Sequence, residues 1–97
     1  IQYVPFHQRA WHAGASFWDE RERCNDFTIG IELEGCDEQY FEQCQYDRLA
    51  ELVRLLCEHY PELNTRQIKG HSQIAPGRKT DPGPYFDWEK LYSLLLE

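Results

Sequence analysis

The stretch from Gln43 to His59 constrains the fold more than any other part of the chain. Apolar residues recur in it at helical spacing, and charged residues fall between them. Pro61 follows shortly afterwards, and a proline cannot continue a helix. The pattern therefore predicts one long amphipathic helix that buries an apolar stripe against a core. The stripe consists of Leu49, Leu52, Val53, Leu56 and Tyr60.

Strand-like patterns lie before and after this helix. In residues 27–35 the apolar side chains alternate with Thr28, Gly30, Glu32 and Glu34, as on the two faces of a strand. Residues 1–6 alternate in the same way, and residues 67–69 are a possible third strand. A last helix is predicted over residues 88–95, capped by Asp87. Strands that alternate with helices predict an α/β domain, although two or three strands close a sheet poorly.

Composition and charge narrow the range of partners. The 97 residues are enough for one small domain or part of one, with 41% apolar and 28% charged residues. The net charge of −7 disfavours nucleic acid, because phosphate binding needs a surplus of Lys and Arg. No apolar stretch approaches the roughly 20 residues of a membrane-spanning helix, so we expect no membrane partner.

The cysteines bear on the cellular compartment. Their even number permits disulfides, but the predicted helix would hold Cys44 and Cys57 apart along its length. No two of the cysteines stand at the C-x-x-C spacing of metal and redox motifs. Reduced, mostly buried thiols in a cytoplasmic protein are therefore the favoured interpretation. The four cysteines are Cys24, Cys36, Cys44 and Cys57.

Polar groups stand at three places where packing alone does not require them. Glu32 follows Gly30 on one strand face, and it is either solvated or part of a cleft that Gly30 leaves open. His71 and Asp81 carry side chains that bind zinc well, but a lone histidine and a distant aspartate are weak evidence. Lys79 is either a surface lysine or an ammonium that stabilises negative charge beside such a metal.

Several motifs occur together in the order and spacing of one family. They are IQYVPF at 1–6, RAWHAG at 9–14, RCNDF at 23–27, IGIELEG at 29–35, GH at 70–71, IAPGRKTDPGP at 74–84 and FDW at 86–88. With these motifs the chain resembles the AmpD-like N-acetylmuramyl-L-alanine amidases of the amidase type 2 family, to which peptidoglycan-recognition proteins are related. The resemblance covers essentially the whole chain, and its most specific part runs from Gly70 to Pro84.

The resemblance implies roles for particular residues. His71 and Asp81 correspond to zinc ligands, Glu32 to the residue that activates the attacking water, and Lys79 to the residue that stabilises the oxyanion. A catalytic zinc keeps three protein ligands and one open position, and amide hydrolysis needs a base and a positive group beside it. The residues implied to line the substrate groove are Trp11, Arg23 and Ala75.

The implied activity is zinc-dependent (Zn2+) hydrolysis of the amide bond between N-acetylmuramic acid and L-alanine in peptidoglycan fragments. The resemblance further implies a muramyl-peptide substrate, expected in its anhydro form, and a place in cytoplasmic cell-wall recycling. Two alternatives remain open. One is a non-catalytic peptidoglycan-binding module, which typically lacks a ligand or the catalytic pair. The other is an inactive, truncated fragment.

The chain departs from the family pattern at its beginning. The family's other zinc ligand is a histidine upstream of the segment that matches Ile1, and neither His7 nor His12 aligns with it. We therefore expect residues 1–97 to be the C-terminal portion of a single amidase domain, with part of a mixed sheet and flanking helices. An exposed sheet edge would favour pairing with another copy or another chain. Tight zinc binding by the isolated fragment would instead point to His7 or His12 as the third ligand.

Overall fold

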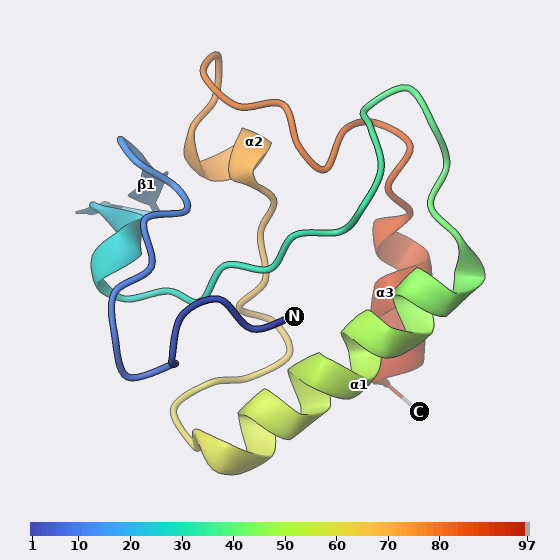
Figure 1. Cartoon of the computed structure of the whole chain (residues 1–97), viewed down its shortest axis with the longest axis horizontal. Coiled ribbons are helices and arrows are strands. Elements are labelled where there is room, and N and C mark those ends of the chain that lie inside the picture. The colour runs from blue at the N-terminus through green and yellow to red at the C-terminus, as the bar shows by residue number, and fades with distance from the viewer. Residues whose placement is uncertain (97) are drawn as a thin grey trace.

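Figure 1 shows the computed structural model, which describes residues 1–96. In chain order the elements are β1 (Phe17–Trp18), β2 (Arg21–Glu22), the 3-10 helix η1 (Cys24–Asp26), α1 (Gln43–His59), α2 (His71–Ile74) and α3 (Trp88–Leu95). Helices α1 and α3 pack together at one end of the molecule, while β1, η1 and α2 gather at the other (Figure 1). None of the helices in residues 1–96 combines the length and the apolar character that crossing a membrane requires.

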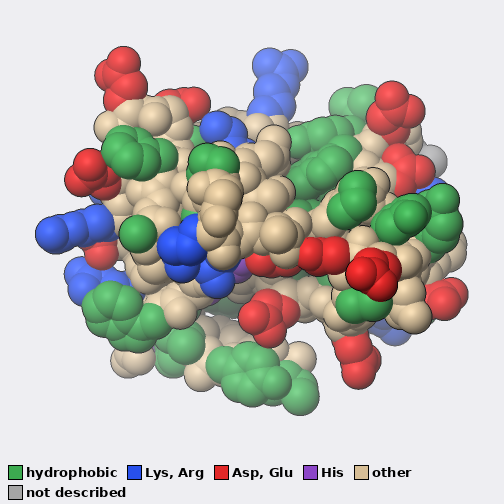
Figure 2. Space-filling model, turned by 90° about the horizontal axis from the view of Figure 1, so that it is seen from above, with side chains coloured by type: hydrophobic (Ala, Val, Ile, Leu, Met, Phe, Trp, Pro, Cys, Tyr) green, Lys and Arg blue, Asp and Glu red, His purple; other side chains and the backbone are tan. Residues whose placement is uncertain are grey.

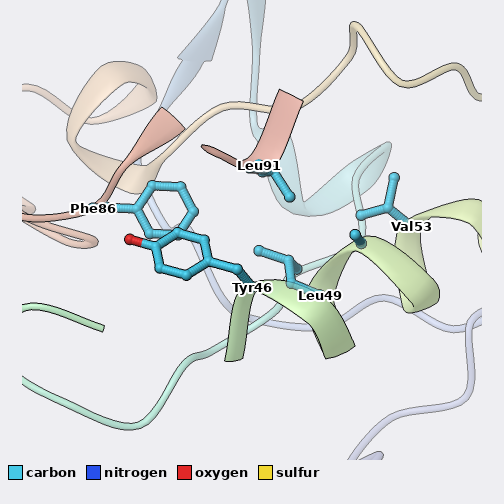
Figure 3. Packing of buried hydrophobic residues seen from close by; sticks show 6 residues of the cluster. Tyr46, Leu49, Val53, Phe86 and Leu91 are labelled. Atoms are coloured by element: carbon cyan, nitrogen blue, oxygen red, sulfur yellow. The ribbon is translucent and has the colours of Figure 1, made fainter. Parts of the chain in front are cut away.

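The two long helices form as predicted. Helix α1 begins at Gln43, where the side chain of Gln45 accepts a hydrogen bond of 2.7 Å from the N–H of Glu42. Helix α3 begins after Asp87, whose carboxylate accepts a hydrogen bond of 3.0 Å from the N–H of Lys90. Their facing sides form the larger core cluster (Figure 3). Its buried members are Tyr46, Leu49, Ala50, Val53, Phe86 and Leu91.

A second, smaller cluster lies at the other end of the molecule. Ala13, Cys24 and Ile74 are buried there, and Trp18 and Phe27 pack against them. Residues 27–35 run between the two clusters, because Phe27 packs on the smaller one and Leu33 on the larger one. Figure 1 shows this stretch as an extended trace across the middle of the molecule. This connecting stretch carries Glu32, one of the predicted site residues.

The predicted strands at 1–6, 27–35 and 67–69 do not form within residues 1–96. A strand is stabilised by a ladder of hydrogen bonds to a neighbour, and alternation alone does not supply that neighbour. Residues 28–33 have no regular secondary structure and pair with no strand among the described residues, while Phe27 lies in a turn and residues 34–35 form a bend. Residues 1–6 include a turn instead, since the N–H of Gln8 donates to the carbonyl oxygen of Pro5 at 2.9 Å.

The strands that do form lie where no strand was predicted. β1 and β2 are antiparallel, with Phe17 opposite Glu22 and Trp18 opposite Arg21. Asp19 lies at their turn with φ 55°, in the left-handed region that tight hairpin turns use. Each strand has two residues, too few for alternation to be visible in the sequence. Helix α2 was missed for the same reason, because its four residues show no helical period.

The cysteines differ in part from the prediction. All four are free, as expected. Cys24 is fully buried and Cys57 is half-buried, but Cys36 and Cys44 are exposed. Cys44 lies in the first turn of α1 and does not belong to the larger core cluster. The prediction of mostly buried thiols is therefore wrong for two of the four.

Candidate metal and active site

The side chains of His71 and Asp81 meet at the start of α2. Nδ1 of His71 lies 2.7 Å from Oδ2 of Asp81. The backbone supports this contact, because the N–H of Ser72 donates to the carbonyl oxygen of Asp81 at 2.9 Å. Gly70 leaves room for the returning loop, since a Cβ there would lie 2.5 Å from Cδ of Pro82. The imidazole is 13% exposed and the carboxylate 55% exposed, so the pair lies at the edge of the interior.

The chemistry of the His71–Asp81 pair fits two zinc ligands. Imidazole nitrogen and carboxylate oxygen both bind zinc at about 2.0–2.2 Å, which places two ligand atoms of a tetrahedral site about 3.3 Å apart. The two atoms, now 2.7 Å apart, would therefore have to separate only slightly to bind the ion between them. In residues 1–96 no group of three or more His, Cys, Asp and Glu side chains is arranged to hold a metal. The His71–Asp81 pair thus has the chemistry of two metal ligands, and its role in binding zinc remains a prediction.

His12 contacts this pair, and its only predicted role was that of an alternative third ligand. Its Nδ1 lies 3.0 Å from Nε2 of His71, and the two rings stack with centroids 5.3 Å apart. Its Nε2 lies 2.7 Å from the hydroxyl oxygen of Thr28. His12 therefore contacts the ring nitrogen of His71 that points away from Asp81. His12 and Asp81 therefore lie on opposite sides of the His71 ring.

Two features of the sequence place His12 there. Oδ1 of the buried Asn25 accepts hydrogen bonds from the N–H groups of His12 at 3.0 Å and Ala13 at 2.8 Å. Gly30 leaves space for the ring, because a Cβ at Gly30 would lie 2.5 Å from Cγ of His12. Gly30 was predicted to allow a close approach by a backbone or a ligand. The group that approaches is the imidazole of His12.

Arg78 joins the loop that carries His12 to the loop that carries Asp81. Its guanidinium donates to the carbonyl oxygens of Ala13 and Ala15, in the latter case at 2.9 Å. Lys69 also makes a structural contact, because its ammonium lies 3.4 Å from Asp19. Two of the four bases between residues 63 and 80 are therefore engaged with the protein itself. Lys79, by contrast, faces the site.

The electrostatics of the site favour neutral imidazole at His12. Burial lowers the pKa of His12 below its ordinary value of 6.5, and the neighbouring charges of His71 and Lys79 lower this pKa further. Lys79 and both histidines line the same cavity. The backbone of Lys79 is held by a hydrogen bond of 3.0 Å from its N–H to the carbonyl oxygen of Ala75.

A cavity of about 1180 Å³ brings the predicted chemical groups together. His71, Asp81, Lys79 and Glu32 all line it, and so does His12. Glu32 is exposed on the extended stretch that crosses the molecule. In Figure 2 a small histidine surface lies between basic and acidic side chains near the middle of the view. The structure thus gathers both predicted ligands and both predicted catalytic residues around one space.

The three residues predicted to contact substrate do not line this cavity. Trp11 is 80% exposed, and the guanidinium of Arg9 lies 5.1 Å from the centre of its ring. Arg23 is exposed and has φ 58°, at the start of η1. Ala75 is only 4% exposed, so little of its surface can meet a ligand. Their roles in substrate binding remain a prediction.

Known proteins similar to this chain are amidases. Residues 1–84 match the sequence profile of the N-acetylmuramoyl-L-alanine amidase family. The chain is 54% identical over 95 residues to the 1,6-anhydro-N-acetylmuramyl-L-alanine amidase AmpD of Enterobacter cloacae, which covers 98% of this chain and 50% of that protein. The chain therefore spans about half the length of the curated relatives it matches.

Two solved structures share the fold. A selenomethionine derivative of AmpD matches with a TM-score of 0.92 and 53% identity, over 98% of this chain and 52% of that one. AmpDh3 of Pseudomonas aeruginosa, in complex with anhydromuramic pentapeptide, matches with a TM-score of 0.83 and 38% identity, over 97% and 40%. These matches confirm the predicted α/β class of an amidase type 2 fold. The chain belongs to the N-acetylmuramoyl-L-alanine amidase family.

Proposed function

We propose that the full-length gene product is a zinc-dependent amidase that hydrolyses the bond between muramic acid and L-alanine in peptidoglycan fragments. The observation that carries this proposal is the His71–Asp81 contact of 2.7 Å, in a cavity that Glu32 and Lys79 also line. A non-catalytic binding module does not require two metal ligands, a general base and a positively charged group around one cavity. Family membership supports the same reaction.

The 1,6-anhydro form of the sugar is the proposed substrate. The relative from Enterobacter cloacae is named for that form, and the structure of AmpDh3 contains an anhydromuramic pentapeptide. Such fragments arise when cell wall is degraded, so we place the activity in cell-wall recycling. The four free cysteines support a reducing compartment, and we propose the cytoplasm.

Each residue of the site has one task in this proposal. His71 and Asp81 hold the zinc ion, which when bound acts as a Lewis acid toward water and the substrate carbonyl. Glu32 accepts a proton from the attacking water and returns it to the amine of the departing L-alanine. Lys79 places a positive charge beside the carbonyl oxygen as negative charge develops on it.

The third ligand is proposed to come from outside residues 1–96. No suitable group of three metal-binding side chains exists within that range, and the chain matches about half of its relatives. We accordingly propose that residues 1–97 are the C-terminal portion of a single amidase domain. The remaining ligand would then come from the rest of that domain, or from another chain or copy that pairs with this one.

Product analysis tests the proposed reaction. The purified full-length gene product is incubated with 1,6-anhydro-N-acetylmuramyl-tripeptide, and the mixture is examined by mass spectrometry. We expect two products, the anhydromuramyl sugar and the free tripeptide. Treatment with a chelator should stop the reaction, and added zinc should restore it. Binding of the intact substrate without cleavage would instead identify a peptidoglycan-binding module.

A further inference from the structure

We propose that His12 and Thr28 are positioning residues that determine which nitrogen of His71 is available to a metal ion. This inference rests on the proposed function, because it concerns the metal site of that activity. It is carried by a continuous set of hydrogen bonds. The set runs from the carbonyl oxygen of Cys24 through Thr28 and His12 to Nε2 of His71, whose Nδ1 lies 2.7 Å from Asp81.

The hydroxyl of Thr28 sets the direction of these hydrogen bonds. It donates its single hydrogen to the carbonyl oxygen of Cys24, 2.6 Å away. It therefore has to accept a hydrogen from Nε2 of His12, which lies at 2.7 Å. A neutral imidazole carries one N–H group, so Nδ1 of His12 is left as an acceptor.

The same logic continues to His71. Nδ1 of His12 lies 3.0 Å from Nε2 of His71, and one of the two nitrogens has to donate. Because His12 is the acceptor, His71 donates from Nε2. Nδ1 of His71, 2.7 Å from Asp81, is then the ring nitrogen left to share a cation with that carboxylate. A nitrogen lone pair and a carboxylate that face each other suit a cation between them.

This arrangement performs a task that metal sites require. A metal-ligating histidine generally donates its other ring N–H to a fixed partner, which sets the tautomer and the orientation of the ring. Here the partner is a second histidine, itself fixed on both sides. Gly30 backs its ring, and Asn25 holds its backbone through two hydrogen bonds.

Without the Thr28 hydroxyl, Nε2 of His12 would no longer have an acceptor that fixes the direction of these hydrogen bonds. His12 could then carry its hydrogen on Nδ1 and donate to His71. The hydrogen of His71 would move to Nδ1 and bond to Asp81, where it competes with the metal. Thr28→Val should therefore weaken zinc binding, whereas Thr28→Ser keeps the hydroxyl and should preserve it.

A matched pair of variants at His12 separates positioning from simple packing. His12→Leu removes both ring nitrogens. His12→Asn places its amide oxygen close to the position of Nδ1, where it can accept the N–H of His71. The dissociation constant for zinc is measured in the full-length gene product by competition with a chromophoric chelator. We expect a loss of roughly 10- to 100-fold for Thr28→Val and His12→Leu, and changes within about threefold for Thr28→Ser and His12→Asn.

Nitrogen-15 NMR of the zinc-free wild type supplies a test that needs neither a variant nor a metal. We expect the neutral ring of His12 to carry its hydrogen on Nε2. A hydrogen on Nδ1 would overturn the proposal. Unchanged zinc affinity in both Thr28→Val and His12→Leu would also overturn it, as would equal losses in His12→Asn and His12→Leu.

The outcomes also separate this inference from the proposed function. A wild type that binds no zinc but carries the His12 hydrogen on Nε2 would contradict the zinc-dependent activity and support the hydrogen-bond arrangement. A wild type that binds zinc and carries that hydrogen on Nδ1 would support the activity and contradict the positioning role.

Discussion

Nδ1 of His71 lies 2.7 Å from Oδ2 of Asp81, and one turn of helix and one loop between them create the contact. The N–H of Ser72 bonds to the backbone of Asp81, and Gly70 gives the returning loop room. Both proposed ligands are therefore positioned by local structure. The two proposed ligands come from one short segment, whereas their neighbour His12 comes from a distant part of the chain.

Replacement of either proposed ligand should remove the metal. In the full-length gene product, His71→Ala and Asp81→Ala each delete a zinc-binding atom, so we expect loss of bound zinc and of amide cleavage. Zinc content is measured by elemental analysis and cleavage by product formation. His59→Ala is the control, because His59 is exposed at the end of α1. Stoichiometric zinc in either ligand variant would remove that residue from the site.

The residues beside the metal should affect the rate and leave the metal bound. We expect Glu32→Gln and Lys79→Met to lower the rate of cleavage by roughly 10²-fold or more, the usual effect of losing a general base or an oxyanion-stabilising group. Glu34→Gln is a matched control on the same exposed stretch. Rates near that of the wild type would return Glu32 or Lys79 to the role of a surface residue.

The lowered pKa of His12 predicts a pH dependence of stability in the zinc-free protein. The folded state binds a proton at His12 less readily than the unfolded state, whose pKa is near 6.5. This contribution to stability is complete above that value and is lost as the pH falls below it. Urea unfolding at pH 7.5 and pH 5.5 measures the change. The decrease should be smaller in His12→Asn, and equal decreases in the two proteins would contradict the prediction.

The contact between α1 and α3 should dominate the stability of this part of the fold. Leu91 is fully buried between the helices, so we expect Leu91→Ala to lower the free energy of unfolding by about 2–5 kcal/mol. Leu96 is 86% exposed, and Leu96→Ala should change it by about 0.5 kcal/mol or less. Urea denaturation of the full-length gene product compares the two. Equal effects would mean that this cluster is not a stabilising core.

Local patterns account for the part of the fold that could be predicted. Helix α1 spans 17 residues, enough for its period to be visible, and Pro61 marks its end. Alternation in residues 27–35 wrongly predicted a strand, because strand pairing depends on another segment. Helix α2 and the β1–β2 hairpin are too short to leave a periodic signal.

The site residues, like the elements of the fold, could be predicted only where a local pattern identified them. His71, Asp81, Glu32 and Lys79 could be named because their motifs resemble those of a family, and the structure places all four around one cavity. His12 could not be assigned, because its contact with His71 joins residues 59 positions apart. The sequence signal for this contact was Gly30, because a glycine leaves space for another group, although it does not identify that group.

Anomalous diffraction at the zinc absorption edge, from crystals of the zinc-loaded full-length gene product, tests the central claim most directly. The proposed site predicts one strong peak between Nδ1 of His71 and the carboxylate of Asp81, about 2.0–2.2 Å from each. A zinc ion bound to Nε2 of His71, or no peak within bonding distance of these two residues, would contradict the account.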